Sequence, residues 1–414
     1  MNFPFRVDSI KITGNDTTED YIILRELTFA IGDTINQKSV DFNKERIFSL
    51  RIFNDVNFIP QANDSLNILE INVSESWYIY PVPFFYYKNN DFNKSIYGLD
   101  FKYKNFRGRN ETLILNFSFG FDPSISLNYI SPAFDYENEI SLSSSFTIRK
   151  SSNKSSRALK LYGEDFNYNT YSGQIQIGKR LNPFNSIYSY FHFQYIQGPE
   201  NPELGITASG EQIDRIYSLG FIYVYDTRDL AQFPKEGTYA SVLYTHKGFG
   251  INNINYNLSY VDFRKYRLIL DTFTSKFRLY GRHSFGKLIP FYDYSYLGYD
   301  EFVRGHSDES REGNNSFIAS VEIAYPIIKD WEISLDLPLL PKRLTTARID
   351  IHINIFGDTG FTFENDEKVA LNNFNSGYGW GLSILFLPHN ALRFEYALNE
   401  FGKGEFLFGT GFSF

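Results

Sequence analysis

The stretch EFVRGHSDES, residues 301–310, holds the residues best suited to a specific interaction, with Arg304 followed by a glycine and a histidine. It lies in a segment from Phe291 to Gly313 that is rich in Gly, Asp, Tyr and Ser. A guanidinium presents a planar fork of donors that can hold a carboxylate through two parallel hydrogen bonds. Inside a protein, Arg304 would need such a carboxylate to offset its lost hydration. The plainer alternative is an arginine in a solvated loop.

Acidic residues follow Arg304 closely and raise a second possibility, a cation site. Carboxylate oxygens bind Ca²⁺ and other divalent ions, including those that bridge lipopolysaccharide molecules. A solvated loop tip explains the same composition more simply. The charged residues concerned are Asp308, Glu309, Arg311 and Glu312.

The rest of the sequence offers no motif for catalysis, a metal or a cofactor. The six histidines are scattered without paired spacing, and cysteine is absent, which excludes a thiolate metal site and a disulfide framework. No nucleophile elbow, phosphate-binding loop or dinucleotide-binding motif occurs. The formal net charge of -8 leaves no basic excess to neutralise phosphates, which argues against nucleic acid as a partner. We therefore expect no enzyme, no cofactor and no metal ion.

From Trp77 onwards, apolar and polar residues alternate with a period of two, which is typical of strands that separate two environments. The segment RIDIHINIFGD places four isoleucines on one face, and the other face carries Asp350, His352, Asn354 and Asp358. About sixteen such segments follow one another. They begin near Trp77, Tyr97, Glu111, Ser124, Asn138, Asp165, Ser186, Ile213, Gly237, Asn253, Phe273, Ser316, Ala347, Phe374, Ala391 and Gly404.

These segments predict a transmembrane antiparallel β-barrel of 16 strands. Their number is even, and many reach the length of about ten residues that a tilted strand needs to cross a bilayer. Short connections such as FRGRN and FLPHN alternate with long ones near 150–164, 199–212, 290–315 and 364–373. Short turns on one rim and long loops on the other are typical of outer-membrane barrels.

The aromatic content supports the barrel over a soluble β-protein. The chain has 42 phenylalanines and 31 tyrosines. So many aromatic residues suit a lipid-facing wall with interfacial girdles but would make a soluble sheet aggregate. A sandwich, propeller or solenoid would also alternate, but no blade-sized repeat of about 40 residues recurs. No apolar run of about 18 residues occurs, which excludes a transmembrane helix. The start, MNFPFRVDSI, shows no signal peptide, and we expect the numbering to begin after a removed one.

Residues 1–75 predict a separate small α+β domain in the order β-α-α-β-β. FRVDSIKIT alternates as one strand up to Gly14, and TTEDYIILREL predicts a helix capped by Thr17 or Thr18. SVDFNKERIFSL predicts a second helix, and NDVNFIPQ and LNILEINV predict two final strands. The barrel is expected to occupy residues 76–414.

Both parts resemble the BamA/TamA superfamily, outer-membrane barrels that insert or transport polypeptides and carry periplasmic POTRA domains. IKITGNDTTEDYIILREL, IGDTINQKSVDFNKERIFSLRIFNDVNF and LEINVSE are similar to one POTRA domain. YDTRDLAQFPKEGTY resembles the family's segment at a short periplasmic turn, with Asp226, Asp229, Pro234 and Gly237. VRGH at Val303–His306, NIFGDTG at Asn354–Gly360 and the terminal GFSF match further family segments.

The resemblance implies a loop at about 288–315 that folds into the lumen and is latched by Arg304. In the family the latch comprises the VRG segment, here Val303, Arg304 and Gly305, and an FxDxG element, here with Asp358 and Gly360. The alternation of faces along a strand also predicts that Asp358 points inward, because the isoleucines of the same segment take the lipid face. By the same alternation Glu322, between Val321 and Ile323, points inward. His306 departs from the family's usual aromatic residue, and its imidazole could make the loop contact depend on pH.

The implied function is insertion or translocation of polypeptides, in which a client strand pairs with a barrel seam between the first and last strands. Gly409 and Gly411 would weaken the last strand, whose Phe406, Phe408, Phe412 and Phe414 share one side opposite small residues. The expected partners are outer-membrane lipids and lipopolysaccharide, unfolded outer-membrane or secreted polypeptides, and accessory lipoprotein or periplasmic subunits.

A single POTRA-like domain leaves open an alternative, a barrel scaffold or dedicated translocon subunit for one surface protein or lipoprotein. A simple diffusion pore is a third possibility, against which the predicted lumen-filling loop argues.

Overall fold

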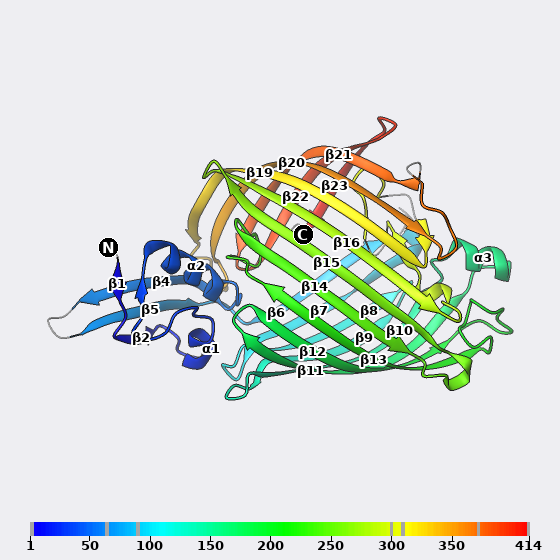
Figure 1. The fold of residues 1–414 in the computed structure, drawn as a ribbon, viewed down its shortest axis with the longest axis horizontal. Helices are drawn as coiled ribbons and strands as arrows, with labels where there is room; N and C mark the ends of the chain where they lie inside the picture. The colour runs from blue at the N-terminus through cyan, green and yellow to red at the C-terminus, as the bar shows by residue number, and fades with distance from the viewer. Residues whose placement is uncertain are drawn as a thin grey trace.

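A computed structural model describes residues 4–62, 66–87, 92–298, 301–307, 311–370 and 373–411. They form a small N-terminal domain at one end of a large barrel (Figure 1). We call the barrel end beside this domain the proximal rim and the opposite end the distal rim. None of the described helices has the length and apolar character needed to cross a membrane. Four of the residues singled out above, Asp308, Glu309, Phe412 and Phe414, lie outside the described residues.

The N-terminal domain packs two helices against a three-stranded sheet. Its elements are β1 (Phe5–Arg6), β2 (Ser9–Thr13), α1 (Asp20–Leu24), β3 (Thr34–Ile35), α2 (Gln37–Phe48), β4 (Phe53–Ala62) and β5 (Asn67–Glu75). β5 is the central strand, parallel to β2 and antiparallel to β4. Ile23 and Ile47 of the helices and Val56, Leu69 and Ile71 of the sheet are fully buried, so the alternating strands and periodic helices share one core.

Two local predictions for this domain are wrong. FRVDSIKIT is not one strand, because β1 leaves the sheet and pairs with β3 instead. Neither Thr17 nor Thr18 caps α1, whose N-cap is Glu19 without a side-chain hydrogen bond. The Thr18 hydroxyl instead donates to the buried carboxylate of Glu75 at 2.7 Å, as do the backbone N–H groups of both threonines. A tertiary acceptor therefore replaces the local capping role.

The predicted barrel is confirmed, with sixteen strands in one antiparallel sheet in chain order. They are β6 (Ile79–Tyr87), β7 (Ser95–Phe106), β8 (Glu111–Gly120), β9 (Ser124–Asp135), β10 (Ile140–Ser152), β11 (Asn167–Asn182), β12 (Asn185–Gln197), β13 (Ile213–Asp226), β14 (Gly237–Lys247), β15 (Tyr256–Ile269), β16 (Phe273–Gly286), β19 (Asn315–Ser334), β20 (Thr346–Phe363), β21 (Asn375–Leu387), β22 (Asn390–Asn399) and β23 (Gly404–Thr410).

The two faces of the wall follow the sequence alternation. Ile353 and Ile355 of β20 are exposed on the outer face, whereas His352, Asn354 and Asp358 are buried on the inner face. Exposed apolar side chains recur around the wall, for example Ile175, Ile187, Phe191, Phe221, Val261, Phe406 and Phe408. This is the pattern that lipid outside and polar groups inside require.

The long connections lie mainly at the distal rim, which also carries α3 (Ser156–Tyr162) (Figure 1). Two connections at the proximal rim are not short. The segment between β13 and β14 spans residues 227–236, and the segment between β19 and β20 spans 335–345. The prediction of a short turn in YDTRDLAQFPKEGTY is therefore wrong, because this connection sends Leu230 and Phe233 into a buried cluster with the N-terminal domain.

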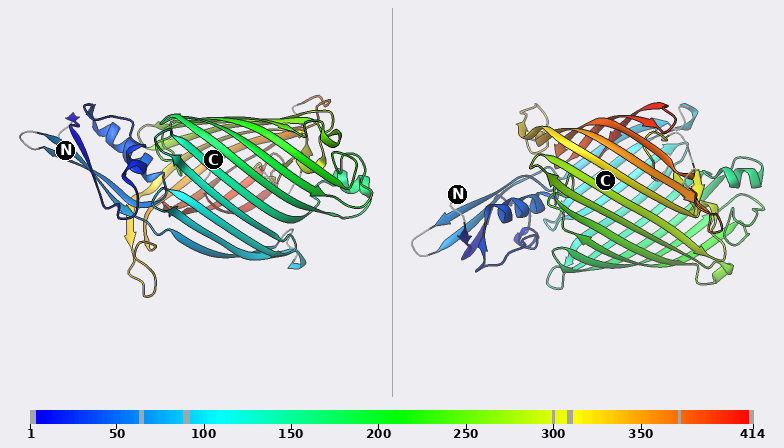
Figure 2. Two further views of the ribbon diagram at one scale, coloured as in Figure 1. Left: turned by 90° about the horizontal axis from the view of Figure 1, so that it is seen from below. Right: turned by 45° about the horizontal axis from the view of Figure 1, so that its top comes forward.

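The N-terminal domain is fixed to several proximal turns of the barrel by arginines. Arg25 donates to Glu139 at 2.6 Å, and Arg51 donates to the carbonyl of His389 at 2.8 Å. Arg46 of the domain and Arg180 of β11 share the carboxylate of Glu26, at 2.8 and 2.9 Å. A further pair joins Arg348 of the barrel to Glu45 of α2. The contacts surround the rim, so the domain covers the proximal opening (Figure 2).

We expect Glu26→Gln to loosen this docking. The substitution keeps the side-chain shape but removes the charge shared by Arg46 and Arg180, and charged hydrogen bonds of this kind contribute about 2 kcal/mol. The measurement is the denaturant concentration at which protease begins to cut the linker at residues 76–78. Glu236→Gln is the matched control, because its exposed pair with Lys38 is worth little. Equal midpoints for the two variants would contradict this account.

Candidate functional site

The connection between β16 and β19, residues 287–314, folds into the lumen, and we call it the lumen loop. It contains a 3-10 turn (η3, Phe291–Asp293) and two short paired strands, β17 (Ser295–Leu297) and β18 (Arg311–Gly313). Val303, Arg304 and His306 are buried although they belong to a polar loop. The backbone turns at Gly305, whose φ of 99° favours a residue without a Cβ atom.

The guanidinium of Arg304 contacts carboxylates from three strands. Nε and Nη2 donate to the two oxygens of Asp358 on β20, at 2.6 and 2.8 Å. Nη1 donates to Glu322 on β19 at 3.2 Å and to Glu395 on β22 at 2.9 Å. The ring of Phe356 lies 3.6 Å from Arg304 Cζ and covers the guanidinium. A single loop residue thus joins strands that are not all neighbours in the sheet.

The charges around Arg304 balance. Lys276 of β16 is fully buried and donates to Glu322 at 2.8 Å, and Arg393 lies 3.9 Å from Glu395. The cluster thus sets three cations against three carboxylates: Lys276, Arg304 and Arg393 with Glu322, Asp358 and Glu395. Buried charges persist only when they are paired in this way, and removing one member leaves its partners uncompensated.

Glycines let the loop backbone approach the wall. A Cβ atom at Gly377 of β21 would lie 1.7 Å from the carbonyl oxygen of Arg304, a distance that no side chain permits. A Cβ atom at Gly360 would lie 3.0 Å from Cγ2 of Val303 and 2.9 Å from the carbonyl oxygen of Phe317. The seat of the loop therefore needs small residues on two adjacent strands.

The lumen loop also holds the last strand. The N–H of Gly305 donates to Glu405 of β23 at 2.6 Å, and the hydroxyl of Ser307 donates to the same carboxylate at 2.8 Å. His306 contacts Glu400, next to the β22–β23 turn, with 2.5 Å between Nε2 and Oε2. Burial alone would raise the pKa of Glu400, but the hydrogen bonds from His306 and backbone N–H groups lower it. The residues on the inner side of β23 are not all small, contrary to the prediction, because Glu405 lies there.

A second anchor fixes the lumen loop near the distal rim. Asp293 accepts hydrogen bonds from Lys247 and Tyr256, each at 2.5 Å. Burial would raise the pKa of Asp293, yet Lys247 and these hydrogen bonds hold it below its ordinary value. Tyr292 donates to Asp214 at 2.7 Å. Of the predicted acidic cluster, Glu312 accepts from the N–H of Arg157 at the start of α3, which leaves a structural role for that residue.

The predicted periplasmic-turn residues form a compact, hydrogen-bonded connection at the proximal rim. Asp226 holds Arg228 through two hydrogen bonds, of 2.8 and 2.7 Å. Asp229 accepts from the backbone N–H groups of Lys235 and Glu236, and burial raises its pKa. Pro234 is buried, and Gly237 begins β14 with a φ of 118°.

Phe233 links this connection to the charged residues around Arg304. Its ring lies 3.7 Å from Nζ of Lys276 and 4.4 Å from the ring of His352, both on the inner wall. Lys276 in turn contacts Glu322, which contacts Arg304. A continuous chain of contacts therefore runs from the proximal connection to the lumen loop.

The sheet is open between β6 and β23. Among the described residues, β6 pairs with β7 alone and β23 with β22 alone. β6 contains Pro81 and Pro83, which lack an N–H. Prolines in sheets occupy edge strands with the missing donor towards the open side, and residues two apart point their nitrogens the same way. The edge of β6 that faces β23 therefore lacks two donors.

The two glycines predicted in the last strand differ in position. Gly409 lies in β23, where a Cβ atom would be 3.2 Å from Nη2 of Arg393. Gly411 lies beyond the end of β23 at Thr410, with a φ of 104°, so its placement in the strand is wrong. Its N–H still donates to the carbonyl of Ala391 on β22 at 2.8 Å.

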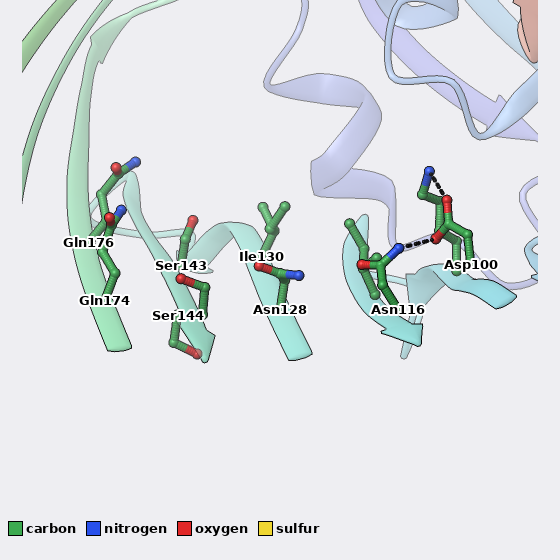
Figure 3. Close-up of a pocket in the computed structure, with 11 residues that line it drawn as sticks. Asp100, Asn116, Asn128, Ile130, Ser143, Ser144, Gln174 and Gln176 are labelled. Atoms are coloured by element: carbon green, nitrogen blue, oxygen red, sulfur yellow. Dashed lines mark hydrogen bonds and ion pairs between the residues drawn. The ribbon is translucent and has the colours of Figure 1, made fainter. Parts of the chain in front are cut away.

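One part of the lumen remains open beside the wall of β7 to β11. A cavity of about 490 Å³ is lined there mainly by amides and hydroxyls, among them Asn116, Asn128, Ser143, Ser144, Gln174 and Gln176 (Figure 3). Its charged lining residues are Asp100 and Lys102, which are paired at 2.9 Å, and Asp100 also accepts from Asn116. The two halves of the lumen differ, since the half near β19 to β22 is packed with ion pairs.

Sequence reasoning missed several residues of this site. Glu395, Glu405 and Lys276 are ordinary inward positions of alternating strands, and nothing local marks them as partners of Arg304. The glycine-rich segment SGYGWG around Gly377 and the two prolines in IYPVPFF were readable signals, because both residue types weaken strands.

The chain is similar to proteins of one superfamily. The model described as the Omp85 superfamily domain matches residues 105–414, and the POTRA model, described as a surface antigen variable number repeat, matches residues 5–76. Comparison with curated proteins by sequence gives no match.

Solved structures share the fold at low sequence identity. BamA from Haemophilus ducreyi lacking POTRA domains 1-3 aligns with a TM-score of 0.55 and 18% identity, over 98% of this chain and 84% of that chain. CdiB from Acinetobacter baumannii gives 0.54 and 16%, over 98% and 73%. CdiB from Escherichia coli gives 0.60 and 12%, over 99% and 77%. Since the superfamily model matches well over half of the sequence, the chain belongs to the Omp85 superfamily, with its barrel in the outer membrane and its POTRA domain in the periplasm.

Proposed function

We propose that this protein inserts polypeptides into the outer membrane, or translocates them across it, by presenting the seam between β6 and β23 as a template. The observation that carries the proposal is the unpaired seam. Each seam strand has one partner among the described residues, so its other edge offers backbone groups to an incoming strand. The proposal requires no bond chemistry.

Two features keep the seam available. The missing donors at Pro81 and Pro83 reduce what β6 could gain by pairing with β23. β23 is short, with seven residues among those described, and beside its pairing with β22 it is held from inside through Glu405. Closing the seam therefore gains less than closing an ordinary pair of strands.

The lumen loop acts in this proposal as a latch. Its guanidinium fixes the inner faces of β19, β20 and β22, and its backbone fixes β23. The strands on one side of the seam thus keep their positions while the edge stays free. The POTRA sheet could receive a client at β2 or β4, each of which pairs only with β5 among the described strands.

A dedicated translocon for one surface protein is the second candidate. The cavity beside β7 to β11 favours it, because its amide and hydroxyl groups can satisfy an extended backbone without holding it tightly (Figure 3). Its two charged lining residues, Asp100 and Lys102, are paired with each other. In either role we expect the protein to work with outer-membrane lipids and lipopolysaccharide, polypeptide clients, and accessory lipoprotein or periplasmic subunits.

Locking the seam tests the function. Variants with one cysteine in β6 and one in β23, placed at successive positions, should form a disulfide across the seam. No other thiol competes, because the chain has no native cysteine. With the locked protein as the sole copy, an insertase should show a general fall in outer-membrane protein levels, reversed by reductant. A dedicated translocon should show the loss of one surface protein. A normal proteome and normal surface proteins despite complete cross-linking would contradict seam templating.

Arg304→Ala should destabilise the barrel by about 3–5 kcal/mol, because it leaves Asp358, Glu322 and Glu395 buried without their shared cation. The measurement is the temperature at which the folded barrel loses its compact mobility on a gel. Arg311→Ala, an exposed residue of the same loop, should change it little. Matching shifts for the two variants would remove the latch from the proposal.

Replacing both Pro81 and Pro83 by valine should strengthen the seam. The variant restores two N–H donors on the edge of β6 while keeping its apolar character. We expect slower hydrogen–deuterium exchange in β6 and β23 and lower activity. Val82→Thr on the same strand is the control. Unchanged exchange in β23 would show that the prolines do not face the seam.

A further inference from the structure

The hairpin formed by β19 and β20 extends beyond the rest of the wall at the periplasmic rim. β19 has 20 residues and β20 has 18, more than any other strand. The neighbouring strand β16 begins at Phe273, and its last pair with β19 is Thr274 with Ala324. From Pro326 onwards β19 therefore pairs with β20 alone. We call residues 326–347 the projecting hairpin.

The projecting hairpin points away from the barrel axis. In Figure 2 (left) it extends, in yellow and tan, past the outline of the barrel wall beside the POTRA domain. A hairpin that leaves the barrel sideways at the rim runs along the surface of the membrane that surrounds the barrel.

One face of the projecting hairpin continues the lipid-facing wall. Along β19 and into the connection, each odd-numbered residue from 321 to 339 is apolar except Lys329. They are Val321, Ile323, Tyr325, Ile327, Trp331, Ile333, Leu335, Leu337 and Leu339. Leu339 at the tip is 101% exposed, and Trp331 is 52% exposed. The acidic residues Asp330, Glu332 and Asp336 lie on the even-numbered face.

The backbone bends without turning this face over. Pairing with β20 shifts between Pro326 and Ile328 and again between Ile328 and Trp331, and each shift adds one residue to β19. A single bulge would exchange the two faces, but two restore the alternation. The bend is held by the N–H of Asp330, which donates to Asp350 at 2.7 Å. The apolar face beyond the bend is therefore the same face that meets lipid before it.

The connection at the end of the hairpin is tied to the POTRA domain through Arg343, on the side that leads into β20. Asn54 donates to the carbonyl of Arg343 at 2.8 Å, and Arg343 pairs with Asp16 and Glu75. The rings of Phe273 and Tyr325 lie 5.3 Å apart and are tilted by 44°, at the level where β16 starts, as in an interfacial aromatic girdle. The leucines of the connection lie further along the chain.

We propose that the projecting hairpin inserts its apolar face into the periplasmic leaflet of the outer membrane. The occupant is a phospholipid surface, because the exposed leucines and tryptophan continue a wall that already meets lipid. The pattern of apolar residues with an interfacial Trp is that of segments that lie in a membrane interface. Between the two shifts Ile328 takes the place of Lys329 on this face, because Ile328 pairs with Ile351. The inference does not depend on the function of the seam.

Fluorescence quenching in vesicles tests this insertion. The full chain, with Leu339→Cys carrying a polarity-sensitive dye, is reconstituted into phosphatidylethanolamine–phosphatidylglycerol vesicles. We expect quenching by nitroxide-labelled lipid as strong as at Phe221→Cys on the wall, and several-fold weaker quenching by aqueous iodide than at Ile31→Cys. Ile31 is the matched control, since it is exposed on the POTRA domain. Equal iodide quenching at Leu339→Cys and Ile31→Cys would overturn the proposal.

A second variant separates burial in lipid from other shielding. Adding Leu337→Asp and Leu340→Asp to the labelled protein should raise iodide quenching to the level of Ile31→Cys, whereas Ser334→Asp on the even-numbered face should not. A label that is shielded in native outer membranes but open to iodide in pure lipid vesicles would indicate a protein partner or a second copy, and this result would also overturn the proposal.

Discussion

A charged guanidinium buried in the lumen is the constraint on which the rest of this barrel depends. Its loss of hydration is tolerable only if carboxylates surround it, and no single strand can supply them. Glu322, Asp358 and Glu395 must therefore converge from β19, β20 and β22. That convergence fixes the register of four consecutive strands, since β21 lies between β20 and β22 and must offer Gly377 as the seat of the loop.

The charge cluster also connects the two ends of the molecule. Phe233 enters from the periplasmic connection and packs on Lys276, whose partner Glu322 is also a partner of Arg304. Further out, Asp293 of the same loop accepts from Lys247 of β14 and Tyr256 of β15, and Tyr292 donates to Asp214 of β13. The POTRA domain, through Leu230 and Phe233, shares one apolar cluster with the barrel. Domain, connection, wall and loop are thus packed as one body.

Much of the fold could be predicted because adjacent residues of a strand point to opposite faces, so their alternation shows which face each one takes. Ile353, Ile355 and Asp358 show their faces directly, and the inward position of Glu322 follows from Val321 and Ile323. Arg304 could be singled out because VRGH is a local motif. Glu395 and Glu405 could not be singled out, because their contacts with the loop depend on how several successive strands are paired. Thr18 prefers a buried carboxylate 57 residues away to the helix beside it. Such long-range choices leave no local mark.

Glu405 has a mechanical consequence for β23. This strand is bonded to β22 on one side and to the lumen loop from within, through the backbone of Gly305 and the hydroxyl of Ser307. A gap opening beside it would not free the end of the chain, because the interior tether limits how far the strand can swing. In the proposed opening of the seam, the Glu405 carboxylate would set how far β23 can move from the lumen loop.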